Sequence, residues 1–252
     1  MKLTEEQIQD NWIKLVETID TRLTGDKRSA VIGMYNDLEA RLLMAPASGF
    51  EHFHNSFPGG YVDHVNRVVE CTERLYKLWK SMGSNVDGFQ YTELLFVALN
   101  HDLGKVGDMD NDLYVPNQSD WHRQNQGKIY TYNDKITNFM SVPDRSIWLL
   151  NQYGVKLSEQ EYLGIKLHDG LYEEGNGQYL KPYSKDRTMS TSLPIIIHQA
   201  DMMASRIEYE MWKTSPQTTT VESRKAKRSK PKEVSMANDS AKDVFKNLFG
   251  NP

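Results

Sequence analysis

Residues 94–99 carry apolar side chains at every position, and the pair His101–Asp102 follows directly after Asn100. A helix that is apolar on all sides is stable only where other elements surround it, so this segment predicts a central helix at about residues 92–101. Such a helix ends in two side chains that can bind a metal, and it places them inside the fold. The rest of the chain must therefore supply the helices that cover it.

Apolar residues three and four positions apart recur along most of the chain, as expected for helices with one buried face. This spacing predicts a first helix from Thr4, with Gln7 completing a capping box and Gly25 as its stop. A helix at residues 159–168 is opened by Ser158 and Glu161 in the same capping-box spacing. Further helices are expected at about residues 31–42, 62–79, 144–153 and 193–213, with loops at 46–60, 102–142 and 170–192. Strand alternation is scarce, so we expect an all-α helical bundle.

Composition divides the chain into three parts. Residues 1–57 are expected to form helices that pack on the core, and residues 58–214 to form the main domain. Residues 215–252 are poor in large apolar side chains and include a basic run at residues 224–232. Such a segment cannot bury enough surface to offset the entropy of ordering, so we expect a disordered basic tail. The final AKDVFKNLFGNP predicts a short amphipathic end.

Composition also excludes several classes of protein. The formal net charge of −4 argues against a surface that is basic all over. The single cysteine, Cys71, excludes an intramolecular disulfide and a cluster of thiolate ligands, and we expect it to be a small core residue. The chain begins without an apolar signal run, and no stretch approaches the roughly 18 apolar residues of a membrane span. We therefore expect a cytoplasmic protein.

Four segments carry side chains that bind metals, and each lies in or at the end of an expected helix. They are GGYVDHVNRV around His64, ALNHDLGKVGD around His101 and Asp102, IKLHDG around His168, and IIIHQADMMASRI around His198 and Asp201. If these helices pack together, two imidazoles and two carboxylates converge in the interior, as in the metal sites of helical bundles. Asp201 has apolar neighbours, and an unpaired charge is costly there, which favours a ligand. Nitrogen and oxygen donors without sulfur suit Mn, Fe, Co, Ni or Zn, and Mg stays open.

The order of these motifs resembles the HD-domain superfamily of metal-dependent phosphohydrolases. Gly-Gly stands three residues before Asp63–His64, and Leu-Gly-Lys follows His101–Asp102. Asp201 comes near the end of the core, so the resemblance covers roughly residues 58–210. It implies that the metal ligands are His64, His101, Asp102 and Asp201. The general plan also resembles the deoxynucleotide phosphohydrolases of some bacteriophages.

The same resemblance implies roles for two further residues. Lys105 matches a lysine that lies close to the substrate phosphate, and His168 matches a histidine that faces the scissile phosphate or binds a second metal. A divalent ion lowers the pKa of bound water and draws charge from the phosphoryl oxygens. Lys105 adds a compact positive charge, and His168 can donate a proton to the leaving oxygen. We expect one tightly held metal. A second metal stays possible, with His122 and His168 as its candidate ligands.

The long irregular segment supplies the candidate substrate-binding residues Trp121, His122 and Arg123. With Tyr130 and Tyr132, they could stack a base and hold a phosphate or sugar. The alternative is an ordinary surface loop anchored by Trp121, and the sequence does not separate the two.

The remaining polar candidates have open interpretations. His198 precedes Asp201 by one turn, so it either orients Asp201 or is a core histidine with its hydrogen bonds satisfied. Arg206 could reach a phosphate, but a salt bridge on the helix surface is the expectation. His52 and His54 lie in an aromatic-rich loop and receive no role.

The sequence thus predicts a metal-dependent phosphohydrolase acting on a nucleotide, most readily a deoxynucleotide, as a triphosphohydrolase or a 5′-nucleotidase. One alternative is an HD-domain 3′–5′ exonuclease or phosphodiesterase, whose nucleic acid the basic tail could follow. Another is a non-catalytic module that binds a nucleotide or a protein partner, the latter through the aromatic end of the tail. The base, the number of phosphates removed and the oligomeric state stay open.

Overall fold

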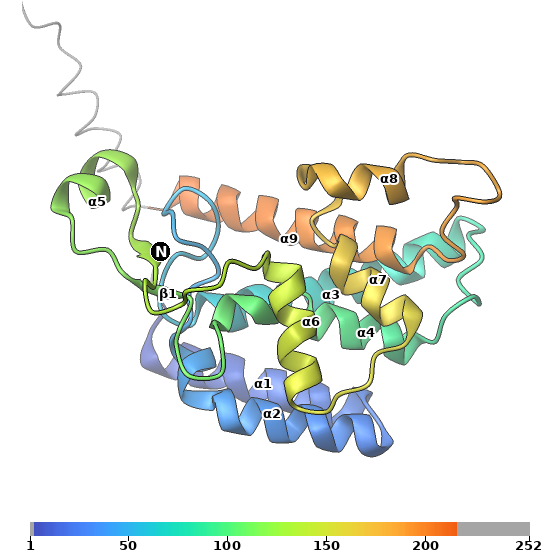
Figure 1. Ribbon diagram of the computed structural model, residues 1–252, viewed down its shortest axis with the longest axis horizontal. Helices are drawn as coiled ribbons and strands as arrows, with labels where there is room; N and C mark the ends of the chain where they lie inside the picture. Colours follow the sequence, from blue (N-terminus) through green and yellow to red (C-terminus); the bar gives the residue numbers. More distant parts are fainter. Residues whose placement is uncertain (1–2, 216–252) are drawn as a thin grey trace, which may run out of the picture. The chain divides into compact units, whose positions relative to one another are not determined.

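The computed structural model describes residues 3–215, and this part of the chain is mostly helical, as the apolar spacing predicts (Figure 1). The predicted basic tail and its amphipathic end lie outside the described residues. In chain order the longer helices are α1 (Glu5–Arg22), α2 (Gly25–Met44), α3 (Gly60–Ser81), α4 (Tyr91–Asn100), α6 (Val142–Gln152), α7 (Glu159–Leu167) and α9 (Leu193–Thr214).

The helix starts follow the predicted caps closely. The Thr4 hydroxyl accepts the N–H of Gln7 at 3.2 Å, while the Gln7 side chain accepts the N–H of Thr4 at 2.9 Å. Ser158 and Glu161 form the same reciprocal pair at the start of α7. The predicted stop at Gly25 is wrong: α1 ends three residues earlier, and Gly25 is the first residue of α2.

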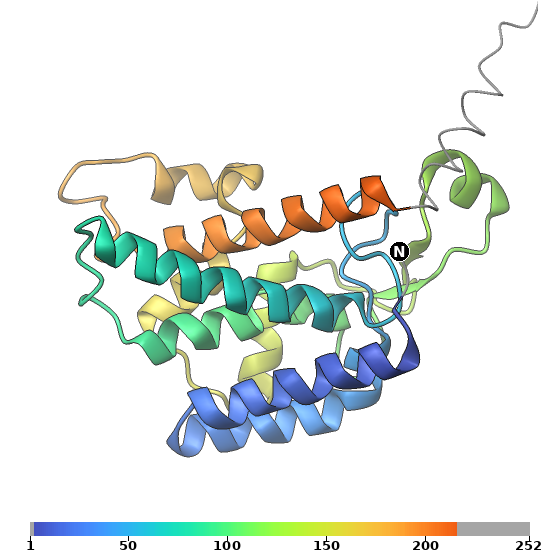
Figure 2. The ribbon, with the colours of Figure 1, turned by 180° about the vertical axis from the view of Figure 1, so that it is seen from behind.

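The most apolar helix is central, as predicted. Residues 94–100 of α4 are all buried. The helix packs between α3 and α7, while α1 and α2 pair with each other and cover α3. Figure 2 shows α1 and α2 together on one side of α3, and α9 on the other side. Buried residues from α1 through α9 form one continuous cluster, which includes Cys71 as predicted.

Helices α3 and α9 are joined by polar contacts. The indole N–H of Trp79 donates to the Gln199 side chain at 2.9 Å, and His64 lies 3.1 Å from Glu208. Because the residue numbers rise along α3 while those of the partners fall, the two helices run antiparallel. Within the described residues, no helix has the length and apolar character that a membrane crossing requires.

The segments predicted as loops contain short elements. They are the 3-10 turn η1 (Leu103–Val106), strands β1 (Tyr114–Pro116) and β2 (Tyr130–Tyr132), helices α5 (Asp120–Gln126) and α8 (Gly177–Leu180), and two 3-10 turns, η2 (Gly170–Tyr172) and η3 (Glu174–Asn176). The two strands pair antiparallel, with Tyr114 opposite Tyr132. Elements of three to seven residues are too short to show a hydrophobic period, which is why the sequence does not reveal them.

Arg41 of α2 holds the turn that follows η1. Its guanidinium donates to the backbone oxygens of Val106 at 2.9 Å, Asp108 at 2.8 Å and Asn111 at 2.6 Å. It also pairs with the Asp112 carboxylate at 2.8 Å. A guanidinium carries five N–H donors in a rigid fork, so one side chain can serve several carbonyls at once. The N-terminal helices therefore support the segment directly behind His101 and Asp102.

Candidate metal centre

Three helices bring His64, His101, Asp102 and Asp201 together. The Nε2 atom of His64 in α3 lies 3.1 Å from Asp201 Oδ1 in α9 and 3.4 Å from Asp102 Oδ2. The Nε2 atom of His101, at the end of α4, lies 3.5 Å from Asp102 Oδ2 and 3.9 Å from Asp201 Oδ1. Two imidazoles and two carboxylates, far apart in the chain, thus meet within the helical core.

Close backbone packing fixes the turn that carries His101 and Asp102. The Ser146 hydroxyl in α6 accepts the N–H of Gly104 at 2.8 Å and donates to the His101 carbonyl at 2.9 Å. A Cβ atom on Gly104 would lie only 2.3 Å from the Val142 carbonyl oxygen, so only glycine allows α6 this close. The glycine two residues after the His-Asp pair is therefore a packing requirement.

The ring orientations of the histidines are set by their outer nitrogens. The Nδ1 atom of His101 lies 2.9 Å from the Ala98 carbonyl oxygen, and that of His168 lies 2.8 Å from the Ile165 carbonyl oxygen. Because a carbonyl oxygen only accepts, both Nδ1 atoms carry the proton and the Nε2 atoms are left to face the site. The Nδ1 atom of His64 lies 3.1 Å from both oxygens of Glu208. This is how proteins orient histidines that bind metals.

The inward nitrogens fit a cation. Among the described residues, Nε2 of His64 and Nε2 of His101 are buried without a hydrogen-bond partner. A lone pair that faces a carboxylate oxygen is repelled by it, unless a proton or a cation lies between them. Buried polar groups are rarely left in this state, so the arrangement favours an ion held jointly by these nitrogens and oxygens.

The charges of the site influence one another strongly. Burial alone would raise the pKa of Asp102, but Lys105 and His101 hold that pKa well below its ordinary value. Burial disfavours a charge on His64, yet Glu208 and the two aspartates raise the pKa of His64 well above its ordinary value. The centre therefore has a negative field that favours a cation or a proton at its middle.

His168 and Asp169 extend the cluster on one side. The Nε2 atom of His168 lies 3.5 Å from Asp102 Oδ1 and 3.7 Å from Asp169 Oδ1. Burial opposes a charge on this ring, but Asp169 and Asp102 raise the pKa of His168 to about 9. His168, Asp169 and Asp201 form a second group of donors close enough to share an ion. The sequence motif around His168 contains Asp169, but nothing in its spacing assigned a role to that carboxylate.

Lys105 lies at the centre of the cluster. Its ammonium is 2.6 Å from Asp102 Oδ2 and 3.4 Å from Nε2 of His54. It also lines the cavity described below. An ammonium has three donors, so two engaged contacts leave one for a ligand in the cavity.

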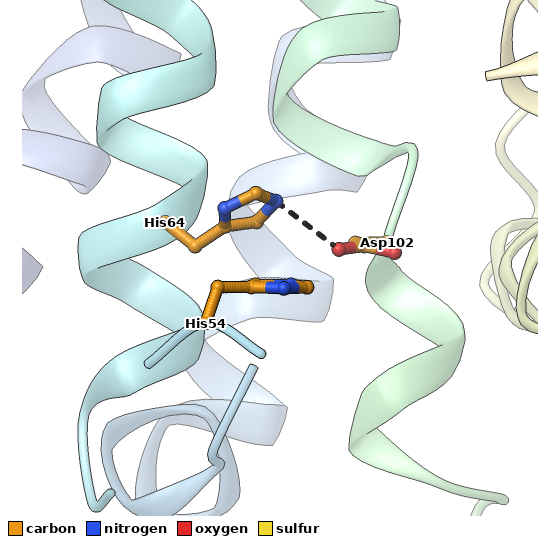
Figure 3. Close-up of side chains that lie close together, drawn as sticks. All are labelled: His54, His64 and Asp102. Carbon is orange, nitrogen blue, oxygen red and sulfur yellow. Dashed lines mark ion pairs between the residues drawn. The ribbon is translucent and has the colours of Figure 1, made fainter. Parts of the chain in front are cut away.

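His54 is a component of the site that sequence reasoning missed. Figure 3 shows its ring below that of His64 and tilted against it, with both directed towards Asp102. The ring centroids of His54 and His64 are 4.8 Å apart. Burial, together with Lys105 and His64, lowers the pKa of His54 well below its ordinary value, so the ring is neutral. With His64 and Asp102 it forms a further group that could hold an ion.

The loop that carries His54 returns to the site because of a glycine. A Cβ atom on Gly60 would lie 2.0 Å from the Asn55 carbonyl oxygen, so this approach excludes any other residue. The sequence contains the signal in the Gly-Gly pair, which marks a close backbone contact without saying which neighbour makes it.

Glu208 is a second missed residue, and it acts behind the ligands. It is 2% exposed and accepts from His64, while Arg67 Nε lies 3.2 Å from Glu208 Oε1. It stands seven residues after Asp201, two turns along α9, and therefore on the same face. That spacing is the signal that could have identified it.

The three predicted substrate-binding residues lie elsewhere. Trp121, His122 and Arg123 are on α5, which has no buried residue, and none of them lines the cavity. Trp121 is 60% exposed and does not anchor the segment. Arg123 donates to the Asn117 carbonyl oxygen at 2.6 Å and pairs with Asp120. Their assignment to substrate binding stays a prediction.

A cavity of about 760 Å³ opens beside the cluster. His54, Asp102, Lys105 and Asp201 are among its lining residues. Five aromatic rings also line it and are partly or mostly exposed, namely Phe53, Tyr132, Phe139, Tyr172 and Tyr209. The polar cluster is thus reached through a pocket with an aromatic mouth.

His198 and Arg206 differ from their expected roles. The Nδ1 atom of His198 lies 2.9 Å from the His168 carbonyl oxygen, so the ring supports the His168 turn and does not orient Asp201. It is half-buried and lines the cavity, so it is not a core histidine either. The surface salt bridge expected for Arg206 is absent among the described residues, where Arg206 donates to the Tyr172 hydroxyl at 3.1 Å.

Comparison of this chain with protein-family models, with curated proteins and with solved structures found no match in any of the three. The site is therefore interpreted from its own geometry. Its donors are imidazole nitrogens and carboxylate oxygens, a set that binds divalent first-row metals and, through its oxygens, Mg²⁺.

Proposed function

We propose that this chain is a metal-dependent phosphohydrolase of the HD-domain type that acts on nucleotides, with deoxynucleotides as the leading class. One observation carries the proposal. The imidazoles of His64 and His101 turn unpartnered nitrogens towards the buried carboxylate of Asp102 and the half-buried one of Asp201, directly beside Lys105 in the wall of a large cavity. A cation site next to a fixed positive charge suits a phosphate group more than any uncharged substrate.

His64, His101, Asp102 and Asp201 would hold the divalent ion. When bound, such an ion lowers the pKa of water and withdraws charge from phosphoryl oxygens. Glu208 and the carbonyl oxygen of Ala98 keep the two rings in the protonation state that a ligand needs.

Lys105 would stay with the substrate phosphate throughout the reaction. Asp102 holds its ammonium at 2.6 Å, and His54 accepts a second N–H. The charge is therefore positioned before substrate arrives, which is the condition under which an electrostatic contact contributes most to catalysis.

His168 would serve one of two roles that depend on its proton. Asp169 and Asp102 raise the pKa of His168, which favours a protonated ring that can donate to the leaving oxygen. A neutral ring could instead bind a second ion together with Asp169 and Asp201. The number of ions bound per chain separates these roles.

The aromatic mouth of the cavity supports a nucleotide as the substrate. Phe139 is 93% exposed and Tyr172 is 71% exposed, although large apolar rings are usually buried. Stacking of a base on exposed rings contributes roughly 1–3 kcal/mol per base. We therefore propose that the base is recognised at the cavity and not on α5.

The test is a screen of nucleotides against the full chain reconstituted with Mn, Co, Ni, Fe, Mg or Zn, with products resolved by chromatography. We expect a nucleoside together with tripolyphosphate or phosphate. His101→Ala and Asp102→Ala should remove both bound metal and turnover, whereas Lys105→Ala should keep the metal and lower turnover. Mononucleotides released from an oligomer would instead identify an exonuclease, and binding without turnover for every metal would identify a binding module.

A further inference from the structure

The middle of α9 forms a wall of the cavity. The residues of α9 that line the cavity are His198, Asp201, Met202, Ser205, Arg206 and Tyr209. They recur every three or four positions, with two adjacent pairs at 201–202 and 205–206, which is the pattern of a single broad helix face. The cavity thus extends from the metal centre along α9, and the eight steps from Asp201 to Tyr209 correspond to about 12 Å of helix.

Arg206 is a cation in this wall without a paired carboxylate. Among the described residues no carboxylate oxygen lies within ion-pair distance of it, and it donates to the Tyr172 hydroxyl at 3.1 Å. A guanidinium has five donors, so most of its capacity faces solvent or the cavity. Because the Tyr172 oxygen accepts from Arg206, the hydroxyl proton of Tyr172 is left to donate to a ligand.

The position of Arg206 differs from that of Lys105. Lys105 touches Asp102 in the floor of the cavity, whereas Arg206 stands five residues beyond Asp201, about 7.5 Å further along the helix axis. The carboxylates of Asp169 and Glu173 also line the cavity and repel anions. An anion can therefore bind in this region only if a second positive charge of the protein lies beside it, in addition to the cation at the metal centre.

We propose that Arg206 and Tyr172 form a second phosphate subsite, which holds a phosphate group that is not the one hydrolysed. This inference rests on the proposed function and narrows it. A monophosphate cannot occupy the metal centre and this subsite together, whereas a nucleoside di- or triphosphate can. The chain therefore selects polyphosphorylated nucleotides, which favours the triphosphohydrolase over the 5′-nucleotidase.

The subsite can be tested by binding alone. The full chain loaded with Mn²⁺ is titrated with inorganic tripolyphosphate and, separately, with orthophosphate. Arg206→Met keeps an unbranched, flexible stem but removes the guanidinium and its charge. We expect it to weaken tripolyphosphate binding roughly tenfold or more, as for a lost charge-assisted hydrogen bond. Orthophosphate binding and the Mn²⁺ stoichiometry should not change. Tyr172→Phe should weaken tripolyphosphate binding less.

Arg74→Met is the matched control, because Arg74 is an exposed arginine on α3 that pairs with Glu70. Equal tripolyphosphate affinity in wild type and Arg206→Met would overturn the subsite, and so would an equal loss for orthophosphate. A wild type that binds tripolyphosphate through Arg206 but hydrolyses no nucleotide would keep the subsite and refute the proposed function. If the chain hydrolyses only monophosphates, and Arg206→Met does so at the wild-type rate, the proposed function would be kept and the subsite refuted.

Discussion

At the scale of single residues, metal affinity should depend on a side chain that touches no metal. Glu208 fixes the His64 ring through its Nδ1 atom and is itself paired with Arg67. Outer partners of this kind change metal affinity about 10–100-fold when they are replaced. We expect Glu208→Gln to weaken Mn²⁺ binding by this amount in a competition assay with a chelator. Glu70→Gln, an exposed change on α3, is the control, and equal affinities in both variants would contradict this role.

His54 offers a second prediction at this scale. His54→Phe keeps an aromatic ring against His64 but removes the nitrogen that accepts from Lys105. We expect turnover to fall about tenfold, the effect of losing one hydrogen bond to a charged group, with metal content unchanged. Metal content, measured together with turnover, separates a role of His54 in positioning Lys105 from a role as a metal ligand. A variant that loses its metal would show that His54 is a ligand.

The two kinds of site residue were not equally visible in the sequence. His64, His101 and Asp201 stand in helices, where the polar side chain interrupts an apolar face and the helix direction predicts burial. His54 lies in a loop, and no period relates it to the core. Its place depends on the close backbone contact between Gly60 and Asn55, which the Gly-Gly pair permits but does not specify. The salt bridge expected for Arg206 is wrong because its partner, the Tyr172 hydroxyl, lies 34 residues earlier in the chain, and the helix period does not show such a contact.

At the scale of elements, Arg41 should stabilise the turn behind the His-Asp pair. An ammonium cannot reproduce the fork that serves Val106, Asp108 and Asn111, so Arg41→Lys leaves backbone oxygens without their donor. We expect the free energy of unfolding to fall by about 1–3 kcal/mol in urea denaturation. Arg22→Lys, which changes an arginine half exposed and paired with Glu73, is the control. A loss no larger than that of the control would mean that the turn holds without Arg41.

The same turn should respond to acid. Burial alone would raise the pKa of Asp108, but the N–H groups of Asp110 and Asn111 hold that pKa below its ordinary value. Because the pKa is lower in the folded chain, the carboxylate stabilises the fold above its unfolded pKa of about 3.9 and loses this effect as the pH falls through the folded value.

Asp108→Asn should therefore lower the free energy of unfolding by about 1 kcal/mol at most at pH 7, with the difference shrinking below about pH 4. Melting curves of both proteins across this pH range measure it, with the exposed change Asp134→Asn as the control. A difference that stays constant from pH 7 to pH 3 would show that the charge of Asp108 does not hold the turn.

Elements were predictable where they were long. Helix α4 is predicted by the unbroken apolar run at residues 94–99, which is buried in the structure. Helices α1 and α7 are predicted by their capping boxes. The hairpin of β1 and β2 has three residues in each strand, and α5 has no buried face, so neither leaves a pattern in the sequence. Their positions are set by contacts with the core.

At the scale of the whole molecule, one core extends from α1 to α9, and the candidate ligands come from three of its helices. An ion that binds only this folded arrangement must stabilise all of it. The gain is RT ln(1 + [L]/Kd), about 2.7 kcal/mol when the free metal stands at a hundred times its dissociation constant. For a chain of this size, that corresponds to a rise in Tm of roughly 5–11 °C.

We therefore expect a chelator to lower the Tm of the metal-loaded protein by this amount, and Mn²⁺ to restore it. Asp201→Asn removes one ligand oxygen, so Mn²⁺ should raise its Tm far less. In chelator the variant should melt somewhat below wild type, because the amide loses the charge of Asp201 beside His64. The Mn²⁺-induced rise within each protein is therefore the quantity that is compared. Calorimetry with and without Mn²⁺ measures all four states. An equal rise in both proteins would show that the ion binds outside this cluster, and the assignment of Asp201 would then be wrong.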